Sequence, residues 1–154
     1  MVWWVGAHGG AGETTLAQLV PGSRAAGHAW PQLTVPAEDG ALAPTKVVLT
    51  ARSNVSGLTA AQRAATEWAA GGVAGVELLG LVIIADAPGR LPRPLKDLTA
   101  LVAGGVPRVW HLPWSEAWRV GEVEQTTSPK ELRRLLADVR ELVAVPDAAH
   151  RGTN

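Results

Sequence analysis

Residues 2–16 read Val2-Trp3-Trp4-Val5-Gly6-Ala7-His8-Gly9-Gly10-Ala11-Gly12-Glu13-Thr14-Thr15-Leu16. The apolar run over 2–5 predicts a buried strand, and the glycines over 6–12 predict a loop. A short helix is expected from Thr14 to Val20, where Pro21-Gly22 ends it. A strand, a glycine-rich loop and a helix in succession can present backbone N–H groups to phosphate. This stretch therefore predicts an α/β fold with a candidate phosphate site.

The rest of the chain continues this alternation of strand-like and helix-like segments. Further strands are expected at 46–50, 78–85 and 108–112, and further helices at 60–70, 94–103 and from 129 onward. Thr59 with Gln62 forms a capping-box pattern, and Ser128, Pro129 and Glu131 form a second helix-start pattern. The alternation predicts a three-layer α/β domain with a mostly parallel sheet and flanking helices. We expect this single domain over 1–145 and a flexible tail over 146–154.

Composition excludes several classes of protein. Of 154 residues, 47% are apolar and 18% are charged, so the chain can bury a sizeable core. Lys plus Arg number 14 and Asp plus Glu number 14, which argues against nucleic-acid binding because that binding needs excess positive charge. The absence of Cys excludes disulfides and thiolate zinc sites, and permits a cytoplasmic location. No apolar run is long enough to predict a membrane span.

The glycine loop matches the phosphate-loop pattern G-x-x-x-x-G-K-[ST] only in part. Gly12-Glu13-Thr14 occupies the last three positions, and Ala7 stands at the first glycine. His8–Ala17 resembles the deviant Walker A motif of ParA/MinD-type ATPases, K-G-G-x-G-K-[ST]-T. In that alignment His8 replaces the signature lysine and Glu13 replaces the phosphate-binding lysine.

The resemblance extends along most of the chain. Trp3–Leu16, Ala85–Leu95 and Val109–Trp114 are similar to an uncharacterised actinobacterial family of short, degenerate ParA/MinD-like proteins. It implies ATP with Mg²⁺ as the ligand, if any nucleotide binds, and Thr14 as the residue on Mg²⁺. It implies these site residues: Gly9, Gly10, Ala11, Gly12, Glu13, Thr14 and Thr15 at the phosphates, with Asp86 and Pro113 beside the base. No catalytic residue is expected.

Losing both lysines should weaken any triphosphate site. Exchanging Lys for Glu changes the local charge by two units, and each is worth roughly 4 kcal/mol at about 4 Å in an effective dielectric near 20. The ParA/MinD pattern also has a Walker B strand before residue 46. Here only the poorly patterned 23–45 segment fills that space, with at most a short strand near 33–35. A rival alignment takes Asp86-Ala87-Pro88-Gly89 as a Walker B aspartate with a D-x-x-G switch.

Three functions follow from these patterns. The preferred one is a non-hydrolysing pseudo-ATPase that acts as a protein-interaction, localisation or assembly module. The second is a slow Mg-nucleotide-binding switch for ATP or GTP, and the third is a structural subunit of a pilus- or conjugation-type complex. The tryptophans at 110, 114 and 118 fit either packing over the sheet edge or a protein interface. A protein partner or a homo-oligomer is expected.

Overall fold

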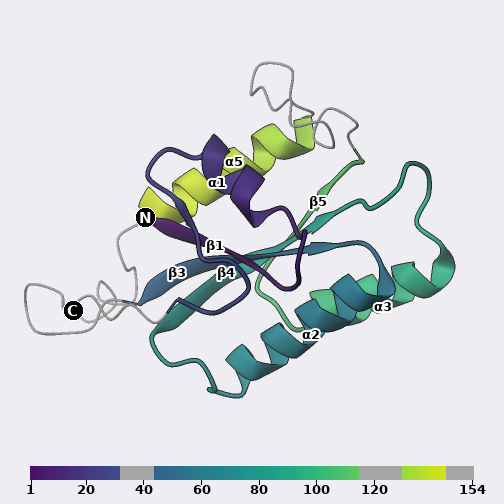
Figure 1. Cartoon of the computed structure of the whole chain (residues 1–154), viewed down its shortest axis with the longest axis horizontal. Helices are drawn as coiled ribbons and strands as arrows, with labels where there is room; N and C mark the ends of the chain where they lie inside the picture. Colours follow the sequence, from purple (N-terminus) through teal and green to yellow (C-terminus); the bar gives the residue numbers. More distant parts are fainter. Residues whose placement is uncertain (32–43, 115–129, 145–154) are drawn as a thin grey trace, which may run out of the picture.

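The computed structural model describes residues 1–31, 44–114 and 130–144, which form a parallel sheet covered by helices on both faces (Figure 1). The strands lie in the order β2-β1-β3-β4-β5, and every neighbouring pair is parallel. Their bounds are Val2–Gly6 for β1, Arg24–Ala25 for β2, Thr45–Arg52 for β3, Val76–Ile84 for β4 and Val109–Leu112 for β5. The predicted three-layer α/β class is confirmed.

Within the described residues, two helices cover each face of the sheet (Figure 1). Helices α1 (Glu13–Leu19) and α5 (Lys130–Ala144) pack on one face, and α2 (Val55–Ala69) and α3 (Arg93–Ala103) pack on the other. Adjacent strand residues point to opposite layers, so Val48 belongs to the first core and Val47 to the second. This burial on both faces explains why β3 and β4 are continuous apolar runs.

Helix α5 presents the apolar stripe that its spacing predicts. Its buried residues are Leu132, Leu135, Leu136 and Val139, and each such side chain contributes about 1.5–3 kcal/mol when fully buried. Arg133, Arg134 and Arg140 lie exposed on the opposite side. Lys46 of β3 donates from Nζ to the carbonyl of Leu142 at 3.1 Å, which satisfies a carbonyl in the last turn. The predicted start at Ser128 and Pro129 lies outside the described residues.

A bulge in β4 places Gly80 against Trp110 of the neighbouring strand β5. The β3–β4 register shifts between Val47 and Val48, which pair with Leu78 and Gly80. A side chain at Gly80 would lie 2.6 Å from Trp110 Cζ3 and 2.7 Å from the Arg108 carbonyl oxygen, so glycine is required there. Trp110 is 8% exposed and donates from Nε1 to Asp138 Oδ2 at 3.0 Å. The indole thus packs β5 against α5, as the packing interpretation expects.

Some predicted boundaries are wrong. Helix α2 begins at Val55 rather than at residue 60, because Asn54 caps it: Asn54 Oδ1 accepts from the Gly57 N–H at 2.7 Å. The Thr59–Gln62 capping box is therefore incorrect, since both residues lie inside α2. Strand β2 was missed because its two exposed residues carry no apolar pattern and are held by pairing with β1. The possible strand at 33–35 and the tail over 146–154 lie outside the described residues.

The strand order creates a crevice between β1 and β3. After β1 the chain continues to β2 on one side, and after β3 it continues to β4 on the other. In parallel α/β sheets ligands bind at the carboxyl ends of the strands where the connections diverge in this way. A ligand site is therefore expected between the loop after β1 and the turn after β3.

Candidate functional site

The glycine loop over residues 7–12 joins β1 to α1, as the sequence predicts. Its start is fixed to the neighbouring strand, because the Ala7 N–H donates to the Thr50 carbonyl at 2.9 Å. Gly10 has φ +76° and Gly12 has φ +99°, both in the left-handed region. A side chain at Gly12 would lie 2.7 Å from Ile84 Cδ1. Glycine at position 12 is thus needed both for conformation and for packing.

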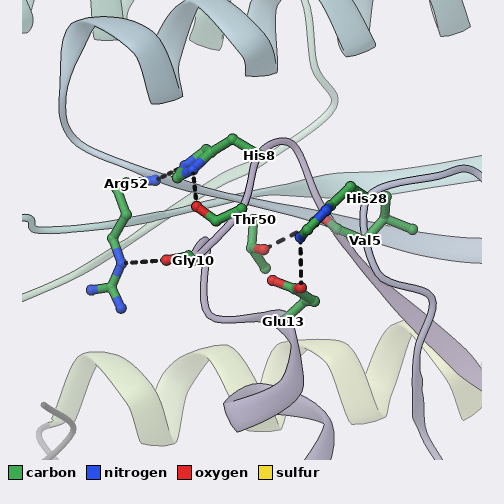
Figure 2. A network of polar contacts seen from close by, with 8 residues as sticks. Val5, His8, Gly10, Glu13, His28, Thr50 and Arg52 are labelled. Carbon is green, nitrogen blue, oxygen red and sulfur yellow. Dashed lines mark hydrogen bonds and ion pairs between the residues drawn. The ribbon is translucent and has the colours of Figure 1, made fainter.

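Glu13, which the ParA/MinD resemblance aligns with a lysine, is turned into the protein (Figure 2). It is 7% exposed, and its Oε1 lies 3.4 Å from His28 Nε2. Its Oε2 lies 2.6 Å from the position of a β-carbon built on Gly6, so the carboxylate rests against that glycine. The Glu13 side chain therefore connects the end of β1, the start of α1 and the segment after β2.

His8, which the resemblance aligns with the signature lysine, uses both ring nitrogens in contacts within the chain (Figure 2). The Arg52 N–H donates to His8 Nε2 at 2.9 Å, and His8 Nδ1 lies 2.8 Å from the Gly9 carbonyl oxygen. Since Nε2 accepts, we assign the proton to Nδ1, which then donates to Gly9. In this arrangement the imidazole is neutral and ties the loop to the end of β3.

Arg52 is a site residue that the sequence reasoning missed. It ends β3, two residues beyond the strand position that pairs with Gly6, and so lies beside the glycine loop. Its Nε donates to the Gly10 carbonyl at 3.1 Å (Figure 2). The terminal guanidinium nitrogens have no acceptor within the described parts of the chain. The available signal was an arginine directly after a buried strand that borders the loop strand.

Asp86 lies at the carboxyl end of β4 and is bonded to the turn after β3. Its N–H donates to Ser53 Oγ at 3.0 Å, and its Oδ2 accepts from Asn54 Nδ2 at 3.2 Å. Asn54 thus joins Asp86 to the N-terminus of α2, since its Oδ1 also caps that helix. Asp86 thus joins the ends of β3 and β4, and its base-contact and Walker B alignments both stay predictions.

A cavity of about 530 Å³ opens between the glycine loop and the ends of β3, β4 and β5. Four predicted site residues line it, namely Gly9, Gly10, Asp86 and Pro113, together with Arg52 and Trp114. The other predicted residues, Ala11–Thr15, do not line this cavity. Ala11 and Glu13 are buried, Gly12 and Thr15 are half-buried, and Thr14 is exposed. The structure therefore divides the predicted site into four residues that line the cavity and five, Ala11–Thr15, that do not.

The structure also bears on metal binding and on membrane spanning. Among residues 1–31, 44–114 and 130–144, no group of three or more His, Asp or Glu side chains could hold a metal ion. The role of Thr14 toward Mg²⁺ stays a prediction. Over the same residues, none of the helices has the length and apolar character to cross a bilayer.

Comparison with known proteins identifies the family of the chain. The sequence model of one family, described as a family of unknown function (DUF6668), matches residues 1–136. The chain belongs to the DUF6668 family. The match includes β1, the glycine loop, Arg52, Asp86 and Pro113, so the whole cavity wall lies within the family region. No curated protein and no solved structure matches the chain.

Proposed function

We propose that this DUF6668 chain is a pseudo-ATPase of ParA/MinD type that does not hydrolyse nucleotide and acts through protein contacts. The observation that carries the proposal is the burial of Glu13 against Gly6 and its contact with the His28 ring, 3.4 Å from Oε1 to Nε2. A working phosphate loop needs a cation at this position in addition to its backbone amides. Here the position holds a carboxylate that is used to hold the loop together.

The residues present do not fit a magnesium-bound triphosphate. The charged side chains that line the cavity within the described residues are Arg52 and Asp86, whose formal charges cancel. A triphosphate would bring several negative charges to a site with one arginine and no lysine from the loop. Hydrolysis would suffer further, because the missing cation stabilises charge that grows in the transition state.

The contacts of His8 support a loop that is kept for its structure. The resemblance implies a lysine here that reaches across a dimer to the nucleotide. His8 instead bonds to Arg52 and Gly9 of its own chain, so it is not available for such a contact. We therefore expect any oligomer of this protein to form without nucleotide.

The protein-contact role is proposed because the chain keeps the fold but lacks the loop lysines that nucleotide hydrolysis needs. Val55 of α2 and Leu101 of α3 are 64% and 61% exposed, and their helices form one layer. The tryptophans argue less for an interface, because those in the described residues are buried or half-buried. Light scattering after size-exclusion chromatography, with and without Mg-ATP, will show whether the chain self-associates independently of nucleotide.

A second candidate is the slow nucleotide-binding switch. The exposed Gly9 and Gly10 at the cavity favour it, whereas the cancelling charges of Arg52 and Asp86 argue against it. It requires that Mg-ATP or Mg-GTP raise the melting temperature, because any ligand of the native state stabilises that state. An unchanged melting temperature across ATP, ADP and GTP would count against it. The pilus- or conjugation-type subunit rests on the resemblance alone.

The deciding experiment combines a phosphate-release assay with a calorimetric Mg-ATP titration, on the wild-type chain and on Glu13→Lys. We expect no ATP hydrolysis by the wild type above the buffer rate. Glu13→Lys should increase Mg-ATP affinity, since it removes the carboxylate and restores the motif's cation. Turnover by the wild type would overturn the proposal, and no gain in affinity by Glu13→Lys would contradict a retained phosphate-loop geometry.

A further inference from the structure

In the described part of the chain, the cavity beside the glycine loop is lined by one positively charged side chain, Arg52, which comes from β3 and not from the loop. Arg52 enters from the end of β3, and among the described residues its guanidinium bonds through Nε alone, to the Gly10 carbonyl. Its backbone N–H is also fixed, by His8 Nε2. The guanidinium is therefore held in place at two points of the residue while its terminal nitrogens lack an acceptor in the described chain.

The surroundings of Arg52 add further donors. Within the described residues, the N–H groups of Gly9 and Gly10 donate no hydrogen bond, and both residues line the same cavity. Ser56, also at the wall, has its hydroxyl bonded to Asn54 Oδ1 at 3.0 Å. The cavity volume of about 530 Å³ is within the usual range for small-molecule sites.

We infer that this cavity binds a phosphomonoester without a metal ion, with Arg52 as the residue that holds the phosphate. A guanidinium presents parallel N–H donors that match two phosphate oxygens, and the loop amides can complete the contact. A single phosphate group balances one arginine far better than a triphosphate does, since Asp86 in the same wall repels additional negative charge. This inference rests on the proposed function, in which the lysine of the loop is lost.

The wall opposite the loop suits an organic group attached to that phosphate. Trp114 is half-buried, and with Pro113 it forms an apolar part of the cavity. Asp86 accepts from Asn54 through Oδ2 alone among the described residues, which leaves Oδ1 for an N–H donor of the ligand. An adenosine monophosphate probe carries all three features: a phosphate, a flat ring and an amino group.

The test is a calorimetric titration of the full chain with AMP, inorganic phosphate, adenosine and ATP, each in EDTA and in Mg²⁺. We expect AMP to bind in EDTA and adenosine not to bind. Arg52→Gln should weaken AMP binding about tenfold or more, the effect of losing a charge-assisted contact. Arg63→Gln, which makes the same charge change on exposed α2, should leave AMP affinity unaltered.

Other results would overturn the inference. These are no binding of AMP or phosphate to a folded wild-type chain, equal affinity of AMP for Arg52→Gln, or adenosine binding as tightly as AMP. Binding of inorganic phosphate as tightly as AMP would support the anion contact and overturn the role of the apolar wall. If circular dichroism shows that Arg52→Gln does not fold, Arg52→Lys is the second variant and should still bind AMP more weakly than the wild type. Wild-type affinity of Arg52→Lys for AMP would contradict recognition of two phosphate oxygens by one guanidinium. ATP hydrolysis would overturn the proposed function instead, whatever AMP does.

Discussion

Glu13 and His8 stand where the resemblance implies lysines, and each has partners inside the chain. The sequence predicts the loss of positive charge at both positions. It does not predict the contacts, because His28 lies in a segment without pattern and Arg52 is 44 residues from His8. Such pairs depend on which strands become neighbours. At the residue scale, the side chains of Glu13 and His8 therefore support the loop.

Glu13→Ala tests whether the buried carboxylate stabilises the fold. We expect the free energy of unfolding to fall by about 1 kcal/mol, since the change removes the pairing to a half-exposed His28 and leaves space beside Gly6. For a chain of this size that is about 2–4 °C in melting temperature. Glu141→Ala, on an exposed part of α5, is the control and should be neutral. Equal melting temperatures for the two variants would contradict the structural role of Glu13.

His8→Lys restores the residue of the motif but cannot accept the Arg52 N–H. We expect a loss of about 1 kcal/mol in urea unfolding, the cost of leaving a partly buried donor without its partner. His8→Gln keeps an acceptor and should lose less. A lysine variant as stable as the wild type would show that the loop does not depend on this bond.

At the scale of elements, the apolar runs predict β1, β3, β4 and β5 well because buried parallel strands have few other sequence solutions. Helix starts are less certain, since several polar residues near a helix can cap it. Asn54 caps α2, although Thr59 with Gln62 gives the more familiar pattern. The two-residue β2 could not be predicted, because backbone pairing alone holds it.

Asn54→Ala should cost about 1 kcal/mol, the usual value of a lost N-cap. The same change frees Asp86 Oδ2 from its bond with Asn54. Thr59→Ala, inside α2, is the matched control and should cost less than about 0.5 kcal/mol. Thermal unfolding of both variants checks the assignment, and the reverse order of stability would return the cap to Thr59.

Gly80→Ala should destabilise the protein by about 1–3 kcal/mol, because the added carbon meets Trp110 and the Arg108 carbonyl. The displaced indole should also shift the tryptophan fluorescence. Gly104→Ala is the control, since Gly104 has φ −68° and the nearest atom to its added carbon lies 3.5 Å away. Equal effects at the two glycines would argue against the bulge as described.

At the scale of the whole molecule, the sequence predicts the α/β class, and the sheet order adds the position of the site. The order places the loop after β1 beside the turn after β3, and this brings Gly9, Gly10, Asp86 and Pro113 to one cavity. Motif matching alone groups the loop residues together, whereas the fold separates Ala11–Thr15 from the cavity wall. Arg52 lies at the candidate site because β3, which ends with it, is the neighbour of β1.

The most direct test of the central claim is calorimetric titration of the wild-type chain with Mg-ATP, followed by a measurement of phosphate release from the same sample. A loop whose lysine position holds the buried Glu13 should show no micromolar affinity for Mg-ATP and no release of phosphate. Micromolar binding that requires Mg²⁺, together with turnover, would contradict the account.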